Sequence, residues 1–522
     1  MSENTTSGVS LRQKILILIT AASIASPIVF IRGAVATALP NLMTQYGSMP
    51  YYSLVLILYT ISTAISPPIA GKLADVLGRR TLCLISAIGY MAGLAGCAFA
   101  QSFPVFLASY LVLGIFFGAM FSMPQAVMGD VIPVAERPKY FSYMLSIQGI
   151  FTMLSSLFAG YIIDAVGPNY VFLAMLPLLV VTLCFIAKNV SNERTAKTRK
   201  IDYLGIFLLV ITLVPIMIII NFVGSRLAPT DPITIIGIIY SIVMAVLLYK
   251  HEIKTEEPIL VFSFFSRKRF CVAAALTACI AAILPINQNY LSLFSQGLMG
   301  LNATTASLLT LPRSVGTIVL PSFFGIYAAK KAGNFRKSFI FCSIVAIPAS
   351  AVLLIMNPNN VELMFLLACF FCALGLAGCG NYPVAAYAQR DLERNEYGAA
   401  AGTLTSIGTI AGSLIGAIIG AVLNSHWNLD KLIPADLKAV LTPAQLSQLS
   451  SNQILKTPAK LDAIQATLSP EAQVLFTEMV ANMKEAMQGA MTGVAIVGIV
   501  FGVAQVLISI FAMDREDKGG TK

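Results

Sequence analysis

The chain has 522 residues, of which 57% are hydrophobic and only 11% are charged. A soluble domain carries about 25% charged residues, so this composition excludes a soluble fold and indicates a protein embedded in lipid. The formal net charge of +10 could indicate a nucleic-acid partner, but the distribution of the charges along the chain favours membrane topology instead. We therefore expect an all-α integral membrane protein that binds no nucleic acid.

Apolar runs of about 20 residues, the length that crosses the hydrocarbon core as a helix, occur fourteen times. The expected transmembrane helices are 15–40, 51–70, 82–101, 104–128, 141–165, 168–188, 204–224, 232–250, 270–296, 305–329, 338–356, 361–388, 398–423 and 490–512. With the N-terminus placed inside, 26 of the 34 Lys and Arg residues fall on the cytoplasmic side. This asymmetry follows the positive-inside rule and predicts that both termini are cytoplasmic.

A long segment, 424–489, separates the last two spans and is expected to form a small helical cap on the outer side. Thr442 and Ser469 suit helix N-caps, and each precedes a proline, which suits the first helical position. Gln445 completes a capping box with Thr442. The sequence leaves open whether this cap is a structural or a selective lid.

A short loop between the second and third spans reads "GKLADVLGRRTL", residues 71–82. Gly71 and Gly78 allow a close approach and a tight turn, Asp75 can cap a neighbouring helix, and Arg79 can anchor the inner face. This loop closely resembles the G-x-L-A-D-x-x-G-R-R signature of the major facilitator superfamily. The resemblance implies that these four residues belong to an inner gate.

A looser copy of the signature, "GIYAAKKAGNFRK" at 325–337, follows the tenth span and indicates two related halves. The resemblance therefore implies two pseudo-symmetric six-helix bundles. The expected domains are a cytoplasmic tail 1–14, a bundle 15–188, linkers with an inserted helix pair 189–269 (helices 204–224 and 232–250), a bundle 270–512 that includes the loop 424–489, and a cytoplasmic tail 513–522. This arrangement resembles the fourteen-span drug:proton antiporter family, as do the segments 124–140, 290–300 and 396–408.

Three positions depart from that antiporter family. Its first span usually carries an acid where this chain has Ile31, its fourth span an arginine where this chain has Tyr110, and its fifth span a Gly-Pro pair where Ser155 and Ser156 stand. No Asp or Glu lies in the middle of any expected span. Because moving protons requires a buried group that changes charge, the resemblance favours proton antiport while the residues supply no evident proton carrier.

Two arginines, Arg32 and Arg313, lie inside expected spans. Each is eight residues from a presumed outer helix end, Pro40 or Thr305, so both are expected about 12 Å deep. An arginine in hydrocarbon costs at least ~2.5–3.5 kcal/mol. With no acid at that depth, arginines that face a wet cavity predict a site for a carboxylate, sulfate or phosphate group. The alternative is that each binds backbone carbonyls or extends toward the outer interface.

Polar side chains in other spans are further candidates for substrate binding. They are Gln125, Gln148, Asn287, Asn289, Tyr290, Gln296 and Asn381. Their alternative role is hydrogen bonding between helices. One stripe is predicted to serve helix packing, because glycine recurs every four residues along one face of the thirteenth span: Gly408, Gly412, Gly416 and Gly420.

The sequence as a whole favours a multi-pass secondary active transporter of the plasma (inner) membrane. Its expected substrate is a small amphipathic organic molecule, either an organic anion or a drug-like compound, moved by alternating access; the resemblance favours multidrug efflux by an antiporter. The alternatives are an uptake carrier or uniporter for organic anions, and a non-transporting membrane sensor on the same fold. We expect no enzyme activity, no cofactor and no metal. The expected partners are the substrate and the lipid bilayer, with protons as a candidate coupling ion, and the protein is expected to be a monomer.

Overall fold

The structure is a computed structural model that describes residues 10–514 except for a set of short segments. These are 49–50, 134–135, 192–201, 223–230, 256–257, 259–260, 287–308, 310, 331–333, 357–359, 380, 394–395, 428–431, 443–444, 447–448, 450–454 and 456–457. Within the described part the regular secondary structure is helical and contains no strand. Ten of the described helices are long and apolar enough to cross a membrane.

The first half of the chain, here called the N-half, folds into helices that follow the expected spans. They are α1 (Leu11–Gln45), α2 (Tyr52–Leu77), α3 (Arg79–Ala98), α4 (Phe103–Val131), α5 (Arg137–Val166) and the 3-10 turn η2 (Pro168–Met175), which continues into α6 (Leu176–Asn189). The inserted pair is α7 (Tyr203–Phe222) and α8 (Pro232–Lys254). α7 packs against α2, α16 and α8.

The second half of the chain, here called the C-half, is more interrupted. Its helices are η3 (Phe262–Ser266), α9 (Lys268–Pro285), α12 (Leu311–Lys330), α13 (Asn334–Ala351), η5 (Val352–Leu354), α14 (Val361–Cys379), α15 (Asn381–Ala388), η6 (Gln389–Asp391), α16 (Tyr397–His426), α18 (Ala435–Val440), α20 (Pro458–Ala466), α21 (Pro470–Leu507) and the π-helical turn η9 (Ile508–Ala512). As far as the described residues reach, most of every expected span lies on helix. The number of crossings and the side on which the termini lie stay predictions.

The first helix corrects one expectation. Pro40 was expected to mark the outer end of the first span, but α1 continues to Gln45. A proline is tolerated inside a transmembrane helix because neighbouring groups can satisfy the carbonyl that loses its hydrogen bond. Counting the depth of Arg32 from Pro40 is therefore wrong. The matching marker for Arg313, Thr305, lies outside the described residues.

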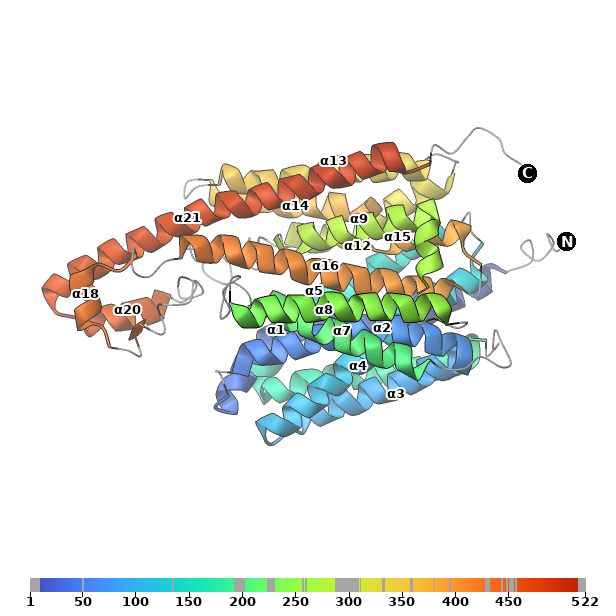
Figure 1. The fold of residues 1–522 in the computed structure, drawn as a ribbon, viewed down its shortest axis with the longest axis horizontal. Helices are drawn as coiled ribbons and strands as arrows, with labels where there is room; N and C mark the ends of the chain where they lie inside the picture. The colour runs from blue at the N-terminus through green and yellow to red at the C-terminus, as the bar shows by residue number, and fades with distance from the viewer. Residues whose placement is uncertain are drawn as a thin grey trace.

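The helices run side by side, and the segment from the end of α16 to the first part of α21 extends beyond one end of the bundle (Figure 1). We call that end the cap end. The opposite end, where α1 begins and η9 finishes, is called the terminal end.

The cap contains the helices that the sequence predicts. The capping box is present: Gln445 N donates to Thr442 Oγ1 (3.3 Å), and Gln445 Oε1 accepts from Thr442 N (2.9 Å). Ser469 caps α21 by accepting a hydrogen bond from the backbone N–H of Ala472. α21 is one 38-residue helix, about 57 Å long at 1.5 Å per residue, so the cap and the predicted last span share a continuous helix.

Two seams join the halves, one between α2 and α16 and the other between α5 and α12. On the first seam, Ser406 Oγ donates to the Ala64 carbonyl (2.6 Å). On the second seam, the hydroxyls of Ser146 and Ser322 are 2.8 Å apart. One buried apolar cluster contains residues of both halves, including Val127 and Val384, whereas a separate cluster of the C-half extends into the cap, from Ile419 to Phe476.

Candidate functional site

Arg32 lies on a helix whose neighbouring side chains are buried. Phe30 and Ile31 are 3% and 2% exposed, whereas the Arg32 side chain is exposed. Its guanidinium is close enough to Tyr59 of α2 to interact with it electrostatically. The Tyr59 ring in turn stacks on Tyr110 of α4, with centroids 4.7 Å apart. The position where the resemblance led us to expect an arginine is therefore filled by a buried aromatic ring, Tyr110, which stacks on the neighbour of Arg32.

Arg313 lies in the C-half, where α12 faces α14. Its charge acts on the thiols of Cys369 and Cys372, which lie on α14. Gly316, about one turn further along α12, packs against Ala373 of α14. Arg313 is partly buried, and its Nη1 atom is buried without a hydrogen-bond partner in the described part of the chain. A buried guanidinium N–H without an acceptor is a favourable position for an anion.

The structure places the predicted substrate residues in different surroundings. Arg32 and Arg313 belong to different halves, and no interaction among the described residues joins them. Gln125 and Gln148 are 3% and 6% exposed, and the Gln125 carbonyl accepts a long hydrogen bond (3.5 Å) from Gln389 Nε2 of the C-half. The remaining predicted positions lie outside the described residues, or have a side chain that does: Asn287, Asn289, Tyr290, Gln296 and Asn381. Their role in binding stays a prediction.

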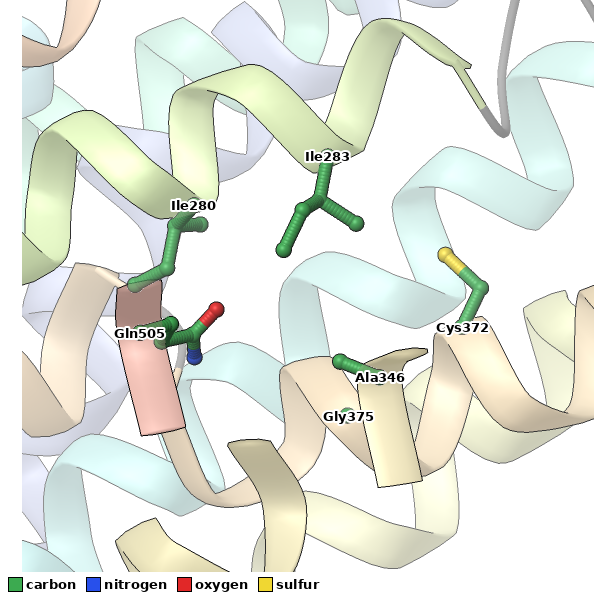
Figure 2. A pocket seen from close by; sticks show the side chains of 6 residues that line it. All are labelled: Ile280, Ile283, Ala346, Cys372, Gly375 and Gln505. Carbon is green, nitrogen blue, oxygen red and sulfur yellow. The ribbon is translucent and has the colours of Figure 1, made fainter. Parts of the chain in front are cut away.

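A small cavity lies inside the C-half between α9, α13, α14 and α21 (Figure 2). It is lined by Ile280, Ile283, Ala346, Cys372, Gly375 and Gln505. Most of this lining is apolar, and all of it comes from one half. The cavity is therefore a packing defect behind α14, not a site shared by the two halves.

The signature loop lies at the terminal end, beside the start of α16 in the C-half (Figure 1). Gly71 faces the start of α16: a Cβ added to it would be 2.6 Å from the Gly398 carbonyl oxygen. Gly78 has a φ of 87°, a conformation that favours glycine. Arg79 is 7% exposed, donates to the Ala126 carbonyl (3.0 Å) and forms an ion pair with Asp130. The Asp75 side chain lies outside the described residues.

A contact that the sequence did not predict crosses between the halves beside this loop. Arg137, at the start of α5, is 4% exposed. Its Nη2 donates to the Tyr397 hydroxyl (3.0 Å), and its guanidinium lies 4.6 Å from the centre of the Tyr397 ring. Arg137 also donates to the carbonyls of Gly129 (2.7 Å) and Ile132 (3.0 Å) at the end of α4, where a cation is favoured by the helix dipole.

The signal for this contact was present but incomplete. Arg137 and Tyr397 lie in or beside two segments, 124–140 and 396–408, that carried the family resemblance, yet 260 residues separate them. Nothing in the sequence pairs them.

Ion pairs at the terminal end bind the C-half together. Arg267 makes two hydrogen bonds with the Glu396 carboxylate, 2.6 and 2.9 Å long. Asp514 accepts from Lys268 Nζ (2.9 Å) and Arg269 Nε (2.8 Å). Burial opposes ionisation of Asp514, but the hydrogen bonds from Lys268 and Arg269 outweigh it, so the pKa of Asp514 is lowered. Glu396 therefore ties the start of α16 to Arg267, which lies just before α9 in the same half, while its neighbour Tyr397 contacts Arg137 of the N-half.

The glycine stripe of α16 changes its surroundings along the helix. A Cβ at Gly408 would lie 3.0 Å from Thr277 of α9, and one at Gly412 would lie 3.6 Å from the Ala281 carbonyl oxygen. A Cβ at Gly416 or Gly420 would meet no described atom within 4 Å. A packing role for the whole stripe stays a prediction.

Comparisons with known proteins agree with this arrangement. The sequence pattern of the Major Facilitator Superfamily matches residues 21–417. "Multidrug resistance protein 3" of Bacillus subtilis (strain 168) is 26% identical over 370 residues, covering 71% of this chain and 72% of that protein. "Multidrug transporter protein MdtP" of the same organism is 24% identical over 497 residues, covering 91% and 89%.

Solved structures with similar folds include two transporters. The human organic anion transporter MFSD10 (TETRAN) superposes with a TM-score of 0.56 at 15% identity, covering 91% of this chain and 99% of that one. The proton:xylose symporter XylE gives 0.53 at 10% identity, covering 90% and 94%. At these identities the similarity shows the fold alone.

Proposed function

We propose that this chain, which belongs to the Major Facilitator Superfamily, is a secondary active transporter that moves small amphipathic organic anions or drug-like compounds across the plasma membrane. Family membership makes it a multi-pass membrane transporter and not an enzyme. Export is favoured because two curated relatives are named for multidrug resistance and multidrug transport. No comparison supports a non-transporting sensor.

The observation that carries the anion preference is Arg32. Its side chain is exposed on a helix whose neighbours are buried, and no described acid pairs with it. Arg313 adds a buried N–H without a described acceptor. A carboxylate, sulfate or phosphate group of a substrate would supply the missing acceptor to one or both guanidiniums.

The proposal also includes an inner gate, and the contacts at the terminal end support it. Here Gly71 meets Gly398 and Arg137 meets Tyr397 across the halves. If the fourteen-span topology holds, with both termini in the cytoplasm, this geometry is a cytoplasm-closed state of the alternating-access cycle. Gly71, Asp75, Gly78 and Arg79 then act in the gate and do not bind substrate.

Two coupling mechanisms are candidates for this transporter. The relatives favour an antiporter, whereas Ile31 and Tyr110 replace residues that the resemblance associates with proton coupling. An uptake carrier or uniporter for organic anions is therefore the second candidate. Transport into proteoliposomes with and without an imposed pH gradient separates the two, because a uniporter for a permanently charged anion would not respond to the gradient.

The anion site is tested by Arg32→Gln and Arg313→Gln in purified protein reconstituted into proteoliposomes. We expect both variants to weaken transport and ligand-induced thermal stabilisation by organic acids, while stabilisation by cationic drugs is kept or rises. Arg12→Gln is the matched control, because Arg12 is an exposed arginine at the start of the same helix. Two correctly folded variants with unchanged transport of organic acids would refute the anion site.

A further inference from the structure

The inserted helix α7 follows α2 along most of its length. Toward the terminal end, Ile69 of α2 packs against the cluster of Leu209 and Leu248, which belong to α7 and α8. Toward the cap end, Ile57 and Ile61 of α2 share a buried cluster with Met217 of α7. The inserted pair is therefore attached to the N-half through α2.

The same helix also touches the C-half at one level. Ile410 of α16 packs against the cluster formed by Ile61 and Met217, and α7 contacts both α2 and α16. Met217 itself is 0% exposed. α7 thus lies where the two halves meet and contacts both of them.

This level lies beside the direct contact between α2 and α16. On its terminal side the two helices are in direct contact: Cβ atoms added to Gly71 and Gly402 would lie 2.6 and 2.3 Å from backbone atoms of the partner helix. The Ser406–Ala64 hydrogen bond closes this stretch. Two residues further along α16, on the other face of the helix, Gly408 faces Thr277 of α9.

The outer helix of the pair holds α7 in this position. Asp202 Oδ1 accepts from the backbone N–H of Gly205 at the start of α7 (2.8 Å), and Asp202 Oδ2 lies 2.8 Å from Nε2 of His251 near the end of α8. At the other end of the pair, a Cβ at Gly237 would lie 2.3 Å from Ile219 of α7. The two helices therefore form a braced unit, not a loose appendage.

We propose that α7 is a wedge between α2 and α16 that stabilises the state in which the terminal end is closed. The inference rests on the proposed alternating-access function. When the halves rock, α2 and α16 shift relative to each other, so the packing of Met217 beside Ile61 and Ile410 must change in the other state. The inserted pair thereby sets the balance between the two states without touching the substrate.

The wedge is tested by Met217→Ala in the full chain in lipid nanodiscs, with hydrogen–deuterium exchange as the readout. Smaller side chains remove packing that exists in the terminal-closed state, so the ratio of the closed state to the open state should fall on the order of tenfold. Exchange of the seam amides in residues 138–149 and 398–406 should accelerate by the same factor. Ile410→Ala should act in the same direction from the other side of the wedge, and Met217→Leu should restore slow exchange.

The matched control is Ile239→Ala, because Ile239 is 56% exposed on α8 and lies away from the seam. Unchanged exchange at both seams in folded Met217→Ala and Ile410→Ala would overturn the wedge, as would equal acceleration in the control. The readout needs no substrate. A chain that transports nothing but shows the wedge effect would refute the proposed function alone, and normal transport with unchanged exchange would refute the wedge alone.

Discussion

The contact between Arg137 and Tyr397 should set how tightly the terminal end is closed. Tyr397→Phe keeps the ring 4.6 Å from the guanidinium but removes the 3.0 Å hydrogen bond. A hydrogen bond to a charged group contributes about 1.5–3 kcal/mol. Because Arg137 keeps its bonds to the carbonyls of Gly129 and Ile132, we expect the lower end of this range, roughly a tenfold loss of the closed state. Tyr397→Leu also removes the cation–π contact, about 2 kcal/mol when desolvated, and should open the gate further.

The assay uses the second seam as a remote reporter. Cysteines at Ser146 and Ser322, whose hydroxyls are 2.8 Å apart, should form a disulfide only while the terminal end is closed. Replacing Cys184 and Cys271, which have accessible surface, limits side reactions. A protease site in the linker 192–201 then shows whether the two fragments remain joined without reductant.

The expected order of cross-linking rates is parent, then Tyr397→Phe, then Tyr397→Leu. Tyr203→Phe is the matched control, because Tyr203 is 74% exposed at the start of α7 and should change nothing. If both Tyr397 variants cross-link at the parent rate, the contact contributes no closing energy and the reasoning is wrong.

Two further predictions concern the same end of the molecule. Gly71→Ala should shift the protein away from the closed state, since its Cβ would meet backbone atoms of Gly398 at 2.6 Å and overpacking typically costs about 1–3 kcal/mol; Gly160→Ala, with no described atom within 4 Å, should leave the cross-linking rate unchanged. Asp514→Asn should lower the melting temperature at pH 7 but not at pH well below 3.8, the ordinary pKa of Asp514. A carboxyl whose pKa is lowered by folding contributes stability above that value and loses it as the pH falls through the lowered pKa, so an equal difference at both pH values would contradict this assignment.

The sequence predicts the helices of this fold well because lipid imposes a simple rule: a run of about 20 apolar residues must satisfy its backbone within one helix. The predicted helix starts were also confirmed. The capping box of Thr442 and the N-cap of Ser469 could be predicted because each depends on residues only three positions apart. The predicted end of the first span was wrong because Pro40, which breaks helices in water, does not end a helix that packs among other helices.

The contacts at the terminal end were only half predictable. Gly71 and Arg79 could be singled out because a contiguous motif contains them, whereas Arg137 meets Tyr397 only through tertiary packing of segments 260 residues apart. The packing of Met217 against residues of both halves could not be predicted either. A transmembrane helix such as α7 is apolar on every side, so its sequence does not distinguish the face that meets protein from the face that meets lipid.

Two departures from the antiporter pattern, at Ile31 and Tyr110, lie close to Arg32 or to its neighbour Tyr59, so we consider them together. Arg32 acts electrostatically on Tyr59, and Tyr59 stacks on the buried Tyr110. An arginine in place of Tyr110 would put a second positive charge into this cluster, and Ile31 supplies no acid to offset it. Two like charges in one partly desolvated cluster repel each other more strongly than they would in water. A chain that places a cation at Arg32 therefore has a physical reason to give up the arginine of the fourth span, and the proposed anionic substrate would bring the missing negative charge with it.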